Sequence, residues 1–305
     1  MSRVVIIGAG HVGSHCAFAL VFRQCVDEIV FIDIDEKKAE YHAQDLADAV
    51  SWMPRHTLVR TGGYGDCSGA DFVVLSAGKG RLPGQSRPEL LAQSIGIMDD
   101  ILPKLKASGF CGFLIGISNP ADVVINYAYN RLDLPKNKVF STGTGLDTAR
   151  LRRFIYESTG IPPCDISAFA LGEHGDSQTA PLSPVRLRGA PLDPVAYGMD
   201  FEATARKAAT IGGFIIDGKG ATEFGIGTTL AEIVYAVLND QKVVMPVSAL
   251  LEGEYGVSGI HAGVPAVIGK GGVEEIVELD LTGPELSAFH RSCEIIRGYI
   301  NSIGD

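Results

Sequence analysis

The sequence predicts an α/β protein, with a Rossmann-type doubly wound parallel sheet followed by an α+β domain. Short apolar runs alternate with stretches of helical spacing, which is typical of a right-handed, mostly parallel sheet. Four of these runs are 4–7, 28–32, 71–76 and 112–117. The pattern becomes less regular after Thr142. We therefore expect one domain over residues 1–142 and a second over 143–305.

The first apolar run leads directly into a glycine-rich turn. An unbroken run of this kind suits a strand buried on both faces, and Gly8, Gly10 and Gly13 follow it as G-x-G-x-x-G. In such a turn the first glycine allows a tight bend, the second lets backbone approach a pyrophosphate, and the third lets the next helix pack closely. The start of that helix would present free N–H groups to the phosphates. The sequence thus predicts a Rossmann-type dinucleotide site that includes His11 and Val12.

A carboxylate follows the second strand, at the position that selects the cofactor. Asp33 lies ~20 residues beyond the glycines, where a carboxylate accepts ribose hydroxyl groups and repels a 2′-phosphate. This order of elements predicts NAD rather than NADP. Asp35 is close enough to take the same role. Ala77 and Gly78, directly after the strand at 71–76, are expected to line the same site.

The remaining elements follow from apolar spacing and from turn residues. In chain order the predicted helices, after the one that begins at the glycine turn, are 35–52, 90–108, 121–132, 146–158, 201–216, 223–238 and 286–303. The other predicted strands are 57–61, 138–141, 166–171 and 185–192. Thr282 and Glu285 have the spacing of a capping box before the last helix. No element is assigned between 239 and 281.

Composition and charge limit the classes of partner. The 305 residues are 46% hydrophobic and 20% charged, as in ordinary globular proteins with a large core. The net charge of −10 argues against nucleic acid or an anionic membrane as the main partner, and no apolar stretch approaches a membrane span. The first strand begins at residue 3, which leaves no room for a targeting segment. The 6 cysteines form no C-x-x-C pair, which favours reduced thiols in the cytoplasm.

Three stretches carry side chains that suit acid/base chemistry and carboxylate binding. His174 lies between glycines in G-E-H-G-D-S. Asp147 and Arg150 lie three residues apart, on one face of a predicted helix. The loop 79–89 carries Arg81 and Arg87. Singly, each has an ordinary explanation, such as a solvated ion pair. Together, downstream of a dinucleotide fold, they indicate an acid/base and a carboxylate clamp.

A series of ordered motifs extends over essentially the whole chain. They are G-A-G-H-V-G, F-I-D, A-G-x-x-R-x-P-G-x-x-R, I-S-N-P, T-G-T-x-L-D-x-x-R, G-E-H-G-D-S, G-K-G-A-T and L-L-E-G-E-Y-G. On these motifs the sequence resembles the L-lactate/L-malate dehydrogenase family, and in particular bacterial L-lactate dehydrogenases. The resemblance implies an NAD-dependent L-2-hydroxyacid dehydrogenase, a small 2-keto or 2-hydroxy acid as substrate, and a homodimer or homotetramer.

The resemblance also assigns roles to matching positions. His174 would be the general acid and base, and Asp147 would fix its tautomer and stabilise the charged ring. Arg150 would hold the substrate carboxylate with its planar fork, and Arg87 would polarise the ketone. Asn119 would bond the substrate oxygen or the nicotinamide. Thr222 would line the substrate pocket, and the loop around Arg81 would close over it as a lid.

Two identities leave the substrate open. Arg81 stands where lactate dehydrogenases usually carry Gln and malate dehydrogenases carry Arg, and a guanidinium there would favour a second carboxylate, as in oxaloacetate. Glu173 and Thr222 match the lactate enzymes, and overall resemblance places pyruvate first. Larger 2-keto acids are a third alternative, because Gln85 and Pro88 depart from the usual loop.

Further alternatives concern regulation and the class of function. Arg152 matches one member of the basic pair that binds fructose 1,6-bisphosphate in some bacterial lactate dehydrogenases, but Ser167 replaces the other, so activation should be weak or absent. His11 and His15 have helical i, i+4 spacing, yet no third ligand is spaced for a metal. A non-catalytic NAD-binding protein and an NAD-dependent glycosidase are rival classes. The combined presence of His174 and Asp147 with the arginines argues against the first, and the absence of the expected metal ligands argues against the second.

Overall fold

The computed structural model describes residues 2–78 and 87–303, and for Arg87 and Pro88 the backbone alone. Within these ranges the strands form a nine-stranded sheet in the order β12-β11-β10-β6-β5-β4-β1-β2-β3 and a three-stranded sheet in the order β7-β8-β9. The strands of the large sheet are β1 (Arg3–Ile7), β2 (Glu28–Ile32), β3 (Leu58–Thr61), β4 (Phe72–Leu75), β5 (Phe113–Gly116), β6 (Val139–Ser141), β10 (Val243–Glu252), β11 (Ser258–Gly269) and β12 (Gly272–Ile276). Those of the small sheet are β7 (Ile166–Ser167), β8 (Arg186–Leu187) and β9 (Ala190–Pro191).

Six strands form the predicted parallel half of the large sheet. Their order, β3-β2-β1-β4-β5-β6, is that of a Rossmann sheet, and each neighbouring pair runs parallel. Residues 4–7 and the whole of β2 are buried, as their unbroken apolar runs predict. The α/β prediction is therefore confirmed, and the strand ends that bind ligands in such sheets lie at a single edge.

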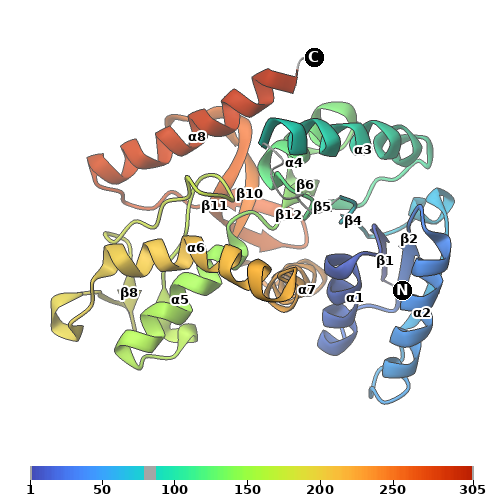
Figure 1. Cartoon of the computed structure of the whole chain (residues 1–305), viewed down its shortest axis with the longest axis horizontal. Coiled ribbons are helices and arrows are strands. Elements are labelled where there is room, and N and C mark those ends of the chain that lie inside the picture. Colours follow the sequence, from blue (N-terminus) through green and yellow to red (C-terminus); the bar gives the residue numbers. More distant parts are fainter. Residues whose placement is uncertain (1, 79–86, 304–305) are drawn as a thin grey trace.

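Helices cover both faces of this sheet. In Figure 1, α3, α4 and α8 lie above the sheet, whereas α1, α2 and α7 lie below it. The small sheet and the helices α5 and α6 lie to one side. The helices are α1 (His11–Arg23), α2 (Glu36–Val50), α3 (Arg87–Ala107), α4 (Ala121–Arg131), α5 (Gly145–Thr159), α6 (Phe201–Lys219), α7 (Phe224–Leu238) and α8 (Gly283–Ile303). None of them, in the described ranges, is both long and apolar enough to cross a membrane.

The C-terminal strands are the main feature that the sequence analysis missed. β10 and β11 form a long antiparallel pair, β12 continues it, and β10 pairs antiparallel with β6 at Ser248 and Ser141. Prolines at 246 and 265 and several glycines interrupt the alternation that identifies a strand, so no element was assigned there. Because of the β6–β10 pair, residues before and after 142 share one sheet and one continuous hydrophobic core. The division into two domains remains a proposal.

A second, smaller core lies between α5, α6 and the small sheet. It includes Leu151, Phe154, Ile166 and Leu187. The strand predicted over 166–171 is shorter in the structure, where regular pairing covers Ile166–Ser167. Beyond it the chain bends towards β11, where Gly172 pairs with Gly263.

The last helix confirms the predicted apolar face and the contact between Thr282 and Glu285 at its start. Phe289, Cys293 and Ile296 are buried in the main core. The backbone N–H of Thr282 donates to Glu285 Oε2 at 2.8 Å, as a capping box requires. Glu285 also accepts the N–H groups of Leu182 and Ser183, so one carboxylate both begins α8 and fixes a distant loop. Burial alone would raise the pKa of Glu285, but its hydrogen bonds with Ser183 and Thr282 lower it to about 2.

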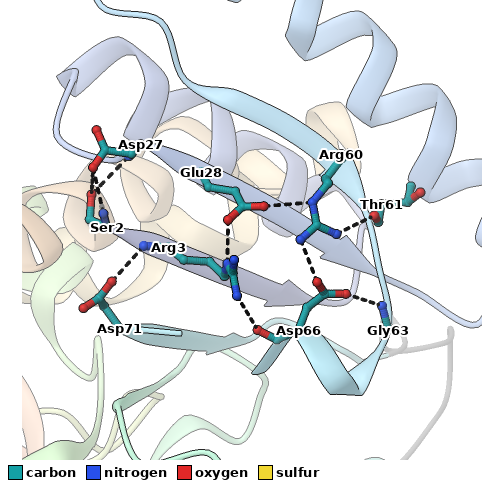
Figure 2. Close-up of polar contacts among 9 residues, drawn as sticks. All are labelled: Ser2, Arg3, Asp27, Glu28, Arg60, Thr61, Gly63, Asp66 and Asp71. Carbon is teal, nitrogen blue, oxygen red and sulfur yellow. Dashed lines mark hydrogen bonds and ion pairs between the residues drawn. The ribbon is translucent and has the colours of Figure 1, made fainter. Parts of the chain in front are cut away.

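A chain of charged groups links the first three strands (Figure 2). The buried carboxylate of Glu28 lies between two arginines: Arg3 Nε is 2.5 Å away and Arg60 Nε is 2.8 Å away. Arg60 continues the chain to Asp66 at 2.6 Å. Burial alone would raise the pKa of Glu28, but the hydrogen bonds and charges of Arg3 and Arg60 together lower it. Glu28 is therefore ionised in the folded protein, and it stabilises the fold above its ordinary pKa.

We expect Glu28→Gln to lower the free energy of unfolding at pH 7 by about 1–3 kcal/mol, because two arginines lose a partner that is only partly screened by water. In the parent protein the same stabilisation should begin to fade as the pH falls below the ordinary pKa of 4.5, and it should be lost as the pH passes the lower pKa that Glu28 has in the folded protein. Urea unfolding between pH 3.5 and 7 measures both effects. Glu202→Gln is the control, because this exposed residue forms an i, i+4 pair with Arg206 and should change little. Equal loss in both variants would contradict the prediction.

Candidate active site

The glycine turn has the geometry that its spacing predicts. Gly8 has φ +104°, and a Cβ there would lie 2.5 Å from the backbone nitrogen of Ala77. A Cβ on Gly13 would lie 2.0 Å from the carbonyl oxygen of Gly8, so the start of α1 can pack against β1 only with glycine at this position. Gly10, by contrast, has open space where a Cβ would be. The turn therefore leaves room beside Gly10 for the close approach of a ligand.

Asp33 is held beside this turn. Its Oδ2 accepts the N–H of Ala9 at 2.6 Å, and its Oδ1 accepts the N–H of Asp35 at 3.0 Å. Asp35 instead caps α2 by accepting the N–H of Lys38, so the competitor that the sequence suggested has a structural role. Asp33 also lines a hollow of about 360 Å³ together with Phe31 of β2. This places one carboxylate at the end of β2, next to the turn.

The imidazole of His174 and the carboxylate of Asp147 form the centre of the site. His174 Nδ1 is 2.6 Å from Asp147 Oδ2. Asp147 is 1% exposed, whereas the side chain of His174 keeps 26% of its surface accessible. Burial alone would lower the pKa of His174, but the charge and hydrogen bond of Asp147, aided by Asp122, raise it to about 9. Burial likewise opposes ionisation of Asp147, but His174 and Arg150 lower its pKa. The pair therefore stays an imidazolium and a carboxylate at neutral pH.

Several backbone contacts fix this pair. Asp147 lies in the first turn of α5, and two threonines of that turn bind the segment before His174. Thr144 donates its hydroxyl to the carbonyl of Ala170, and Thr148 accepts the N–H of the same residue. Further along, the N–H of Glu173 donates to Ser292 on α8. The position of the His174 ring is thus set from both sides of its loop.

Arg150 lies beside the pair on the next turn of α5. Its Nη1 is 3.1 Å from Asp147 Oδ1, and 11% of its side chain is exposed. Burial lowers its pKa despite the charge and hydrogen bond of Asp147. Gly212 of α6 packs against the guanidinium, since a Cβ there would lie 3.0 Å from both terminal nitrogens. A partly exposed guanidinium next to a proton-bearing imidazole can hold a carboxylate close to the proton donor.

The other predicted residues lie where β4 and β5 end, or near α7. Ala77 and Gly78 follow β4, and Ser118 donates its hydroxyl to the carbonyl of Ala77. Asn119 is exposed after β5, with a cis bond to Pro120. Thr222 lies between α6 and α7, and it precedes Glu223. These segments reach the same edge as the glycine turn.

The link that carries Thr222 also contacts the start of α1. Glu223 Oε1 is 3.0 Å from His11 Nδ1, and its Oε2 is 3.9 Å from His15 Nε2. Val12, next in the turn, packs against the main core. Among the described residues no group of three or more histidine, cysteine or carboxylate side chains is arranged to hold a metal ion. The two histidines therefore pair with an acid, which ties the link before α7 to the start of α1.

Two predicted arginines belong to the loop 79–89. Arg81 lies outside the described residues, and the structure gives only the backbone of Arg87, at the start of α3. Arg152, which matches one member of the regulatory pair of some relatives, donates its Nε–H to the carbonyl of Ala168. Ser167 is exposed nearby on β7.

Asp122 is a site residue that the sequence analysis missed. It lies in the first turn of α4, is 1% exposed, and accepts the backbone N–H of His174 at 2.8 Å. An acid in a first helical turn is ordinary, because it suits the helix dipole. The only signal in the sequence was its place three residues after Asn119, just beyond a strand end.

Comparison with known proteins gives a consistent result. Residues 2–141 match the lactate/malate dehydrogenase NAD binding domain, and residues 144–304 match the lactate/malate dehydrogenase alpha/beta C-terminal domain. The L-lactate dehydrogenase of Fusobacterium nucleatum is 40% identical, with 98% of this chain and 96% of the relative covered. L-lactate dehydrogenase 1 of Bifidobacterium longum is 40% identical over 99% and 98% of the two chains. A minor L-lactate dehydrogenase from Enterococcus mundtii, solved in a ligands-bound form, has a TM-score of 0.95 and 36% identity, covering 99% of this chain and 98% of its own.

We expect Gly10→Ala to weaken NADH binding at least tenfold while leaving thermal stability unchanged. The added methyl group has open space in the protein itself, but it would occupy the approach to a bound diphosphate. Gly13→Ala is the matched comparison, and it should lower the free energy of unfolding by about 1–3 kcal/mol, because its methyl group collides with backbone. NADH fluorescence titration and thermal unfolding measure the two effects. Unchanged NADH affinity in Gly10→Ala would place the diphosphate elsewhere.

Proposed function

This chain belongs to the lactate/malate dehydrogenase family, and on that basis we propose that it is an L-lactate dehydrogenase that interconverts pyruvate and L-lactate. It is an NAD-dependent oxidoreductase. The observation that carries the proposal is the buried His174–Asp147 pair with Arg150 on the next helical turn. The relatives reported above are lactate dehydrogenases along their whole length, and this similarity favours pyruvate over the alternatives.

The residues at the glycine turn fit the cofactor. Gly10 leaves open space, the first N–H groups of α1 point out of the turn, and Asp33 supplies a carboxylate for ribose hydroxyls. We assign Gly8, Gly10, His11, Val12 and Gly13 to this site, with Asp33, Ala77, Gly78 and Asn119. When bound, NADH supplies the hydride, and NAD⁺ accepts it in the reverse direction.

His174 handles the proton that accompanies the hydride. In the reducing direction its Nε2 would donate a proton to the ketone oxygen, and in the oxidising direction it would take the proton back. Asp147 favours the charged ring and keeps Nδ1 protonated, so Nε2 faces the substrate. Because the pKa of His174 is raised to about 9, the ring carries the needed proton throughout the neutral range. Reduction should therefore hold its rate up to that pH and fall above it, whereas oxidation should gain.

The arginines would bind and polarise the substrate. Arg150 has donors on a planar fork that matches a carboxylate, and its contact with Asp147 uses Nη1. By family resemblance Arg87 polarises the ketone, and Asn119 and Thr222 complete the pocket. Arg81 is the residue that keeps oxaloacetate open as the alternative, since a second substrate carboxylate would pair with it.

We also propose that the protein works as a homodimer or homotetramer. Phe18 and Phe22 on α1 and Phe224 on α7 are 46%, 67% and 69% exposed. They line a shared groove of about 550 Å³. Exposed aromatic side chains gathered on one surface are typical of subunit contacts, and a second copy is the commonest partner of a soluble enzyme.

A cytoplasmic location is consistent with the thiols. All six cysteines, each within the described residues, are free. Burial raises the pKa of Cys67 and Cys293 to about 12, so these thiols are unreactive. We propose a reducing compartment on this ground.

The function is tested by NADH oxidation with pyruvate, oxaloacetate and 2-ketoisocaproate side by side. We expect the highest kcat/KM with pyruvate, and His174→Asn should reduce it by at least 10³-fold, as loss of a general acid does, while NADH affinity stays unchanged. A higher kcat/KM with oxaloacetate would establish the malate alternative. Retained turnover in His174→Asn would remove that residue as the proton donor.

The assembly is tested by light scattering after size-exclusion chromatography. The parent protein should have the mass of a dimer or tetramer, and Phe22→Asp should shift it to a smaller species, because a charge in an apolar contact is costly. Val195→Asp is the control, since Val195 is 86% exposed and lies outside the groove. An unchanged mass for Phe22→Asp would exclude this surface as a subunit contact.

A further inference from the structure

Asp122 is a buried acid that none of the steps above uses. It is 1% exposed and lies in the first turn of α4, the helix that follows Asn119. Its Oδ2 accepts the backbone N–H of His174, whereas its Oδ1 is buried and has no hydrogen bond. Buried carboxylate oxygens almost always have a partner, because burying an unpaired polar atom is costly. The acid therefore calls for a functional explanation.

The surroundings of Asp122 come from three other parts of the chain. His174 and Glu173 face it from the loop, Ser248 from β10, and Cys293 from α8. The Ser248 hydroxyl lies close enough to support the carboxylate, yet no hydrogen bond of good geometry joins the two. The Cys293 thiol is itself neutral, because burial raises its pKa to about 12. His174 is thus the group in this set able to carry a positive charge beside the acid.

Two carboxylates then act on His174 from different sides. Asp147 bonds to the ring, and Asp122 bonds to the backbone of the same residue. Both charges favour the protonated ring, whereas burial and Arg150 oppose it. Burial raises the pKa of Asp122 to about 6, against the opposing effects of Ser248 and His174. Asp122 is therefore ionised at neutral pH and becomes neutral in mild acid.

We propose that Asp122 is a positioning residue for His174: its carboxylate anchors the backbone and adds its charge to that of Asp147, which keeps the ring protonated. The proposal rests on the acid/base role given to His174 in the proposed function. Its consequence is that the site has a second titrating group that never contacts the substrate. Loss of its charge should lower the pKa of the ring without displacing it.

The test compares Asp122→Asn with the parent enzyme. The amide keeps the size of the side chain and an oxygen that accepts the His174 N–H, so only the charge is removed. The pKa of His174 is read directly from the pH titration of its Cε1–Hε1 NMR signal, which is assigned by its loss in His174→Asn. We expect the inflection to fall by about 0.5–1 pH unit. The upper limb of kcat/KM for pyruvate reduction should shift by the same amount.

Two further variants complete the test. Asp66→Asn removes a carboxylate that pairs with Arg60 and changes the net charge equally, so it should leave both readouts unchanged. Titration of Asp122 near pH 6 should give the His174 signal a second, small inflection. Ser248→Ala keeps the acid but removes its hydroxyl neighbour, which should move this second inflection to higher pH. This variant decides the question if Asp122→Asn does not fold.

The outcomes separate this inference from the proposed function. A His174 titration that is the same in Asp122→Asn and the parent overturns the inference, as does an equal shift in Asp66→Asn. In Ser248→Ala, an inflection near pH 6 that is absent or unmoved overturns it as well. If the His174 titration shifts in Asp122→Asn but the parent enzyme does not turn over pyruvate, the inference is supported and the proposed substrate is refuted.

Discussion

The short contact between His174 and Asp147 is the constraint on which the site depends. A buried carboxylate is stable only with compensating partners, and here the partners are the imidazolium and Arg150. This requirement fixes the first turn of α5 against the loop that carries His174. The hydroxyl groups of Thr144 and Thr148 hold the same two segments together through Ala170. The chemistry and the packing thus require the same arrangement of the chain.

The parallel half of the fold could be predicted because its patterns are local. Each strand is an apolar run next to a turn residue, and the backbone at Gly8 and Gly13 explains why only glycine suits those places. His174 and Asp147 could be named from motifs, although their contact spans 27 residues. The role of Asp122 could not, because its partner lies 52 residues away and its sequence context is that of any helix start. β10 to β12 were missed for the same reason: their identity comes from pairing rather than from alternation.

Buried acids beside arginines have two different uses in this chain. Glu28 is enclosed by Arg3 and Arg60 at the first residue of β2 (Figure 2), so its charge is fully compensated and serves to join strands. Asp147 shares its charge between a guanidinium and an imidazole, and the imidazole can release its proton. The difference is that one of the cations beside Asp147 is an imidazolium, whose pKa of about 9 lies well below that of an arginine.

The antiparallel contact of β6 with β10 has a consequence for recombining this protein with its relatives. A fragment cut near residue 142 would carry an open strand edge, with Val139 and Phe140 freed from the core that they share with the later strands. Such an edge invites pairing with other copies. A chimaera that exchanges nucleotide-binding halves must therefore take β6 and β10 from the same parent, or have the two strands redesigned together.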